Sequence, residues 1–109
     1  MTRTEHLLSI LAEECAEVAQ RVSKALRFGL DETQPGDLKT NAQRIMTEYH
    51  DLQAAIAMLH DEGALPVEHT GVILARIEAK REKVEKYLRY SAACGTLQRT
   101  DDIDREVAK

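Results

Sequence analysis

The sequence is poor in the residues on which several protein classes depend. It has no Trp, one Phe and three Tyr, so its core must be built from aliphatic side chains. Its two cysteines, Cys15 and Cys94, form no CxxC pair, which argues against a zinc site and a structural disulfide, and we expect both to be buried thiols. No apolar run approaches the roughly 18 residues of a membrane span, and the N-terminus lacks the apolar segment of a secretory signal. We therefore expect a cytoplasmic protein with no membrane partner.

Length and charge narrow the choice of partners further. A chain of 109 residues suits one domain of ordinary size. The net charge of -4 argues against a nucleic-acid surface, which would normally be basic. It leaves room for a small anionic ligand held by a local cluster of Lys and Arg.

The spacing of apolar residues predicts three helices and no strands. Residues of this kind recur at helical intervals over about 4–28, from 38 or 40 to 60, and over about 66–93. The segment 28–37, "FGLDETQPGD", interrupts the pattern with two glycines and a proline and is predicted to be a loop. The fold class is therefore all-α.

Glycine and proline mark the helix ends. Gly63 and Gly95 are predicted to stop the second and third helices, and Pro66 to occupy the first turn of the third. The tail after Gly95 has few apolar residues and could form one short helix begun by Thr100. We expect one domain over 1–95 and a C-terminal tail or short helix over 96–109. The expected architecture is an antiparallel bundle of three main helices plus this short segment, completed by oligomerisation.

Five carboxylates lie where apolar residues would be expected. At 100° per residue, Glu13, Glu14 and Glu17 fall within about a 100° arc of the first helix, with Glu14 at the edge of its apolar stripe. Glu48 and Asp51 point the same way from the second helix. A solvated acidic face explains most single glutamates on helices, but burying an unpaired carboxylate is costly. We therefore expect a cation between the helices, either Lys or Arg from the third helix or a divalent ion, Mg²⁺ or Mn²⁺.

These carboxylates match a known pattern. The chain resembles the MazG-like, all-α nucleoside triphosphate pyrophosphohydrolase superfamily in two segments, "EECAEVAQRVSKALRFG" and "NAQRIMTEYHDLQAAIAML". The superfamily motif, E-E-x-x-E on one helix and E-x-x-D on the next, is matched by Glu13, Glu14, Glu17, Glu48 and Asp51. The likeness covers most of the chain up to about Gly95. His50 stands where family members commonly carry a small residue, so the motif indicates the reaction better than it indicates the substrate.

The resemblance implies a metal-dependent enzyme that cleaves (d)NTPs between the α- and β-phosphates to give (d)NMP and pyrophosphate. It implies Mg²⁺, or Mn²⁺ in its place, held by Glu13, Glu14, Glu17, Glu48 and Asp51. One of these carboxylates, Glu14 or Glu17, would be the catalytic group that orients or deprotonates the attacking water. The chain has no P-loop and no GxGxxG, so a glycine-rich turn cannot hold the phosphates.

Basic side chains must therefore bind the phosphates. Lys24 and Arg27 lie one turn apart at the end of the first helix, and Lys80 and Lys83 share a flank of the third. Solvated lysines paired with neighbouring glutamates are the alternative explanation for most of them. Asn41 resembles a family position that contacts the nucleotide, and a helix-terminus role fits it as well.

Two other functions stay open at this stage. The first is a non-catalytic helical interaction module, in which the acids form an interhelical salt-bridge network. The second is a related enzyme on the same scaffold, a dUTPase or a phosphoribosyl-ATP pyrophosphohydrolase.

In each case three helices enclose a thin core, and apolar residues such as Leu8, Leu26 and Leu74 lie outside it. We therefore expect a homodimer or a tetramer.

Overall fold

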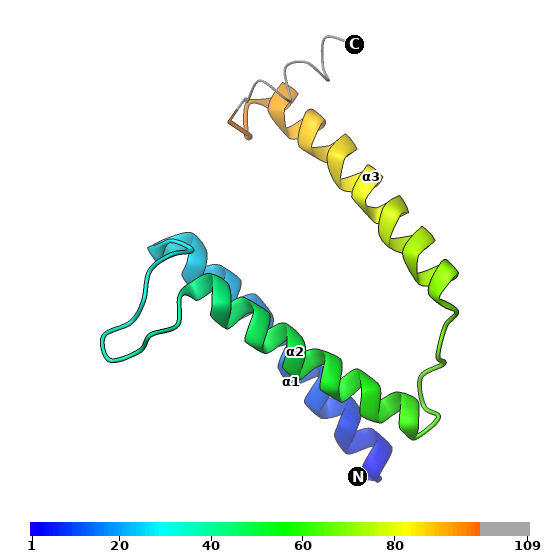
Figure 1. Ribbon diagram of the computed structural model, residues 1–109. Helices are drawn as coiled ribbons and strands as arrows, with labels where there is room; N and C mark the ends of the chain where they lie inside the picture. The colour runs from blue at the N-terminus through cyan, green and yellow to red at the C-terminus, as the bar shows by residue number, and fades with distance from the viewer. Residues whose placement is uncertain (99–109) are drawn as a thin grey trace. The chain divides into compact units, whose positions relative to one another are not determined.

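The computed structural model describes residues 1–98 and contains three helices, α1 (Arg3–Phe28), α2 (Asn41–Asp61) and α3 (Thr70–Cys94) (Figure 1). Within these residues the only strand-like pairing is one isolated bridge between Thr33 and Thr40, so the all-α class is confirmed. None of the described helices is both long and apolar enough to cross a membrane. The short helix predicted to begin at Thr100 lies outside the described residues.

The chain forms two compact units, the first spanning Met1–Val67 and the second beginning at Glu68. The first unit contains α1 and α2, and the second contains α3. The predicted domain boundary at residue 95 stays a prediction.

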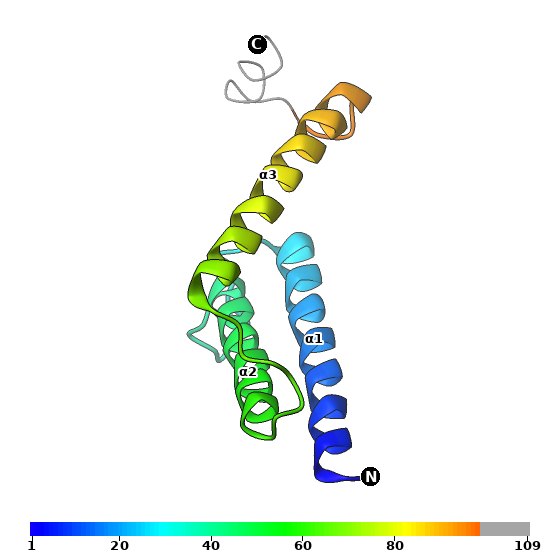
Figure 2. The same ribbon diagram turned by 90° about the vertical axis from the view of Figure 1, so that its right-hand side faces the viewer.

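The first unit is a hairpin of two antiparallel helices. Figures 1 and 2 show α1 and α2 side by side along most of their length, running in opposite directions. Leu7, near the start of α1, and Leu59, near the end of α2, are both buried, and Leu59 is fully buried. The Nε atom of Arg3 lies 2.6 Å from Oε1 of Glu62, which joins the same two ends. Ala25 and Ala55 complete the buried apolar residues of this unit.

The loop between the helices is closed by hydrogen bonds. The helix α1 ends at Gly29, whose φ of 100° suits glycine and whose N–H donates to the carbonyl of Ala25 at 2.8 Å. Asn41, the first residue of α2, is 2% exposed, and its Nδ2 donates to the Gly29 carbonyl at 2.8 Å and to Oε2 of Glu32 at 2.7 Å. The backbone N–H of Asn41 also donates to the carbonyl of Glu32 at 3.1 Å. Asn41 therefore fastens the loop to both helices.

The start of α2 is set by a capping box. The hydroxyl of Thr40 accepts from the N–H of Gln43, and the Gln43 side chain accepts from the N–H of Thr40. The helix ends at Asp61 with Glu62 as its cap, and Gly63 turns the chain away with a φ of 73° and donates its N–H to the carbonyl of His60. The predicted stop at Gly63 is therefore confirmed.

The predicted start of the third helix at Pro66 is wrong. The N–H groups of Ala64 and Leu65 both donate to the carbonyl of Leu59, so the chain is still folded against the end of α2 there. Pro66 follows in a segment without secondary structure. The helix begins instead after His69, whose Nδ1 accepts from the N–H of Gly71 at 3.0 Å.

The predicted stop of α3 is confirmed, because Gly95 has a φ of 79° and caps the helix. The expectation of buried thiols is wrong for this chain, since Cys15 and Cys94 are both exposed. Sequence spacing placed Cys15 near an apolar stripe, but within the first unit α1 packs against α2 alone.

Candidate metal centre

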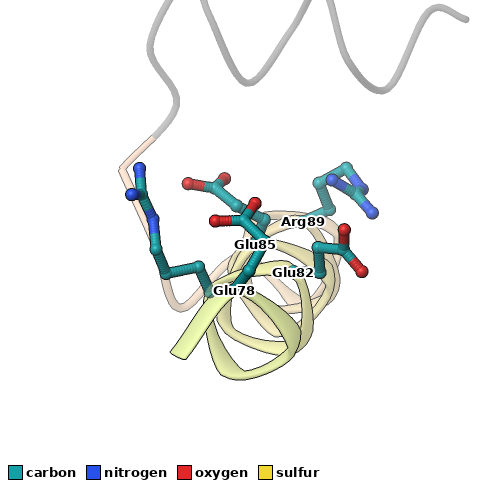
Figure 3. A pocket seen from close by; sticks show the side chains of 5 residues that line it. Glu78, Glu82, Glu85 and Arg89 are labelled. Atoms are coloured by element: carbon teal, nitrogen blue, oxygen red, sulfur yellow. The ribbon is translucent and has the colours of Figure 1, made fainter. Parts of the chain in front are cut away.

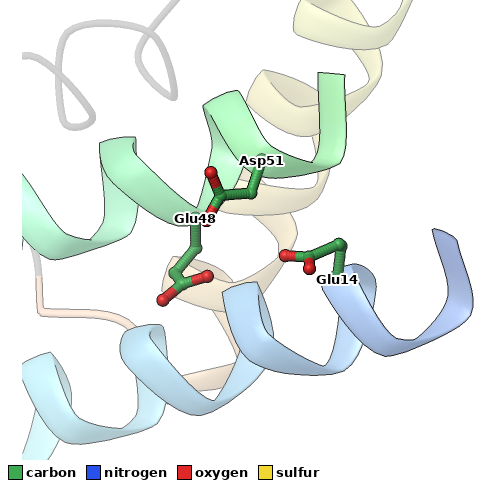
Figure 4. Close-up of side chains that lie close together, drawn as sticks. All are labelled: Glu14, Glu48 and Asp51. Atoms are coloured by element: carbon green, nitrogen blue, oxygen red, sulfur yellow. The ribbon is translucent and has the colours of Figure 1, made fainter. Parts of the chain in front are cut away.

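Three carboxylates meet between α1 and α2. Figure 4 shows Glu14 of α1 directed toward Glu48 and Asp51 of α2. Each residue offers one carboxylate oxygen, and these three oxygens lie within 4.8 Å of one another. Glu14 and Glu48 are half-buried and Asp51 is exposed, so the group is open to solvent on one side. We call these three residues the acidic triad.

The helical spacing of the motif explains this convergence. Glu48 and Asp51 are three residues apart, so they lie on the same side of α2. In the antiparallel pair the start of α1 lies beside the end of α2, where Arg3 contacts Glu62, and the middle of α1 is level with the middle of α2. Glu14 of α1 therefore faces Glu48 and Asp51 of α2.

The electrostatics of Glu14 are unfavourable without a cation. Desolvation raises the pKa of Glu14 above its ordinary value of 4.5, and the negative charges of Asp51 and Glu48 raise it further. Its Oε2 atom is buried and, within residues 1–98, accepts no hydrogen bond. A buried carboxylate oxygen without a partner is unusual and calls for a positive ligand.

The donor set fits a divalent cation of the hard class. Three carboxylates with no His or Cys are the ligands that Mg²⁺ and Mn²⁺ prefer. The spacing of the three oxygens and the unpartnered Oε2 of Glu14 are consistent with this. Glu14, Glu48 and Asp51 are therefore the residues that would hold such an ion.

Two of the five predicted metal ligands do not belong to the acidic triad. Glu13 is exposed and Glu17 is half-buried, and neither is among the three residues whose oxygens converge. Both act on Glu14 as neighbouring negative charges that raise its pKa, although less than Asp51 and Glu48 do. Their roles as ligand or catalytic group stay predictions.

One cation already contacts the triad, and it comes from α1. The Nε atom of Arg21 lies 3.6 Å from Oε1 of Glu48, and both side chains are largely buried. We expected the cation between the helices to be either a Lys or Arg of the third helix or a divalent ion, and did not expect an arginine of α1. Arg21 follows Glu14 by two helical turns and Glu17 by one, and this spacing could have identified it.

The predicted phosphate-binding residues belong to both units of the chain. Lys24 is half-buried near the end of α1, and Arg27, also on α1, lies 5.4 Å from the ring centroid of Phe28. Lys80 and Lys83 are exposed on α3, in the other unit. Asn41 is buried and its Nδ2 hydrogens are both donated within the loop. Asn41 is the first residue of α2, but Thr40 caps the helix and the Asn41 side chain binds the loop instead. Contact of any of these residues with a nucleotide stays a prediction.

A second group of charged residues lies on α3. Glu78, Glu82, Glu85 and Arg89 surround a shallow hollow together with Arg81 (Figure 3). All five side chains come from one helix, at spacings that place opposite charges three or four residues apart. This is typical of a solvated helix face.

Comparison with known proteins gives no relative. No protein-family model, no curated protein and no solved structure matches the chain. The resemblance to the MazG-like superfamily therefore depends on the motif residues themselves.

Proposed function

We propose that the protein is a metal-dependent nucleoside triphosphate pyrophosphohydrolase. The observation that carries the proposal is the convergence of Glu14 from α1 with Glu48 and Asp51 from α2. These residues come from the two halves of the E-E-x-x-E and E-x-x-D motif. The motif itself says nothing about how the two helices pack, so their meeting is an independent support.

The proposed reaction assigns different roles to the triad and to Glu17. Glu14, Glu48 and Asp51 would hold Mg²⁺ or Mn²⁺, which would supply positive charge to phosphate oxygens. Glu17, half-buried on α1 and outside the triad, would accept a proton from the attacking water. Catalysis would consist mainly of positioning and charge neutralisation, as in phosphoryl transfer generally.

We further propose that the enzyme is a homodimer or a tetramer in which α3 completes a helical bundle. Ala92 is the only buried residue of α3, whereas Leu74 is 60% and Tyr90 is 67% exposed. Large exposed side chains such as these on one helix favour packing against a protein partner. Light scattering should report a dimer or a larger assembly at micromolar concentration, and a monomer would contradict this part of the proposal.

The interaction-module hypothesis has weaker support. A structural salt-bridge network would pair each acid with a cation, but within residues 1–98 only Glu48 of the triad has one, Arg21. The buried Oε2 of Glu14 is left without a hydrogen bond. A dUTPase or a phosphoribosyl-ATP pyrophosphohydrolase would use the same triad, and only the substrate would differ.

Product analysis tests the proposed function. Purified protein is incubated with a panel of NTPs and dNTPs, dUTP and phosphoribosyl-ATP included, with and without Mg²⁺, and pyrophosphate and orthophosphate are measured separately. The proposal predicts Mg²⁺-dependent pyrophosphate release that is lost in Glu14→Gln and retained in Glu78→Gln, which removes an exposed acid of α3. Orthophosphate as the product, or no turnover of any nucleotide, would refute it.

A further inference from the structure

A second pocket adjoins the acidic triad. It has a volume of about 230 Å³ and lies between α1, the 29–40 loop and the first turns of α2. Six residues line it: Arg21, Asp37, Lys39, Arg44, Thr47 and Glu48. We call it the basic pocket, because three of these side chains are cationic and two are anionic. All six belong to the first unit.

Within the described chain, two guanidinium Nε atoms at the pocket have no acceptor within hydrogen-bond distance, and the nearest carboxylate oxygen to that of Arg21 is Oε1 of Glu48, 3.6 Å away. The Nε atoms of Arg21 and Arg44 are both buried and have no hydrogen-bond partner within residues 1–98. Their side chains are 22% and 12% exposed, respectively. A buried donor without an acceptor is costly, and two such donors from different helices at one pocket indicate a missing acceptor.

Arg44 is held in place by the loop. Its Nη2 donates to Oδ2 of Asp37, and Oδ1 of Asp37 accepts from the N–H of Lys39 at 2.9 Å. That backbone hydrogen bond lowers the pKa of Asp37, and the charges of Arg44 and Lys39 add to the effect against an opposing contribution of desolvation. Asp37 therefore stays charged at neutral pH and fixes Arg44 before any ligand arrives.

The two carboxylates of the pocket are already engaged with its arginines. Asp37 contacts Arg44, and Glu48 lies 3.6 Å from Arg21. Lys39 adds a third positive charge, so the lining carries a net charge of +1 from three cations and two anions. The volume far exceeds the roughly 10 to 15 Å³ that one water molecule needs.

From this geometry we propose that the basic pocket binds an oxyanion of the phosphate class. Guanidinium groups match the oxygens of phosphate through charge-assisted hydrogen bonds, whereas the hydroxyl of Thr47 already donates to the carbonyl of Gln43 at 3.1 Å. Binding here does not require the metal or the reaction. If the proposed function holds, Glu48 would join the two sites, because it belongs both to the acidic triad and to the pocket. The anion would then be a phosphate of the nucleotide.

The test uses the full chain in EDTA, so that the acidic triad holds no metal. Orthophosphate and pyrophosphate are titrated by isothermal calorimetry against NaCl at matched ionic strength. The proposal predicts saturable binding that Arg21→Gln weakens by about tenfold to a hundredfold, because a charge-assisted hydrogen bond is lost. Lys39→Gln should also weaken it, and circular dichroism checks that both variants keep their helices.

The matched control is Arg3→Gln. It removes one arginine of α1 and one ion pair with a glutamate, far from the pocket at the exposed start of the helix. Affinity should be unchanged in this variant. Heats no larger than those of NaCl, or equal affinities in wild type, Arg21→Gln and Lys39→Gln, would overturn the proposal.

A competition experiment separates the two sources of the anion. A nucleoside triphosphate with a non-hydrolysable α,β-methylene bridge is added to the pyrophosphate-bound protein. Displacement that depends on Arg21 supports a nucleotide phosphate as the ligand, and its failure supports an inorganic phosphate in the same pocket. Anion binding without turnover of any nucleotide would support this site while refuting the proposed function. Turnover of a nucleotide without anion binding in EDTA would support the proposed function and refute the anion site.

Discussion

Removing the side chain of Asn41 should destabilise the protein even when no nucleotide is present. Asn41 is 2% exposed and donates one hydrogen bond to the neutral carbonyl of Gly29 and one to the carboxylate of Glu32. A neutral bond contributes about 0.5 to 1.5 kcal/mol and a bond to a charged group about 1.5 to 3 kcal/mol. Because Glu32 is only half-buried and can be rehydrated, we expect Asn41→Ala to cost about 2 to 3 kcal/mol.

Thermal unfolding followed by circular dichroism measures this cost. For a domain of this size, it corresponds to a fall in Tm of about 10 to 20 °C. Gln53→Ala, which truncates an exposed amide on the same helix, should change stability by less than about 0.5 kcal/mol. A wild-type Tm for Asn41→Ala, combined with weaker nucleotide binding, would refute the structural role and favour direct contact with the substrate.

Three further predictions follow from the same structure. Leu59→Ala should lower the free energy of unfolding by about 2 to 5 kcal/mol, because Leu59 is fully buried. Leu38→Ala, at a site that is 96% exposed, should leave it nearly unchanged, and denaturant unfolding compares the two variants. In EDTA, Glu14→Gln should be more stable than wild type at pH 7.5, and the difference should shrink as the pH falls toward 4.5. The reason is that Glu14, with its raised pKa, takes up a proton in the folded protein before it does in the unfolded chain. Tm values across this range check it, and a constant difference would contradict it. Mg²⁺ at 100 times its Kd should stabilise wild type by about 2.7 kcal/mol, more than NaCl of equal ionic strength, and at the same Mg²⁺ concentration Glu14→Gln should lose about half of this gain or more.

The helices were the easiest part of the fold to predict. Apolar periodicity placed the start of α1 within one residue, because a long amphipathic pattern leaves little choice. The start of α2 could also be predicted from the sequence, because Thr40 and Gln43 have the spacing of a capping box. The start of α3 was misplaced, because proline at Pro66 suggested a first turn and histidine is an uncommon N-cap. His69 acts as a cap here through its ring nitrogen.

The site was only partly predictable for a different reason. Helical spacing put Glu48 and Asp51 on one side of α2, but which acid of α1 meets them depends on the register of the two helices. That register follows from the hydrogen bonds of the loop, such as those of Asn41, which no periodicity reveals. Arg44 precedes Glu48 by one helical turn, so spacing alone could have placed the two residues on the same side of α2. Its ion pair with Asp37 could not be predicted in this way, because it depends on the conformation of the loop.

Direct measurement of Mn²⁺ binding tests the central claim, that Glu14, Glu48 and Asp51 together hold a divalent ion. The metal-free protein is titrated with Mn²⁺, and the unbound ion is quantified by electron paramagnetic resonance. We expect saturable binding in wild type and in Glu78→Gln, and a Kd weakened by about tenfold or more in both Glu14→Gln and Asp51→Asn, because each removes one anionic ligand. If these two variants bind Mn²⁺ as wild type does, or if wild type binds none, the acidic triad is not a metal site.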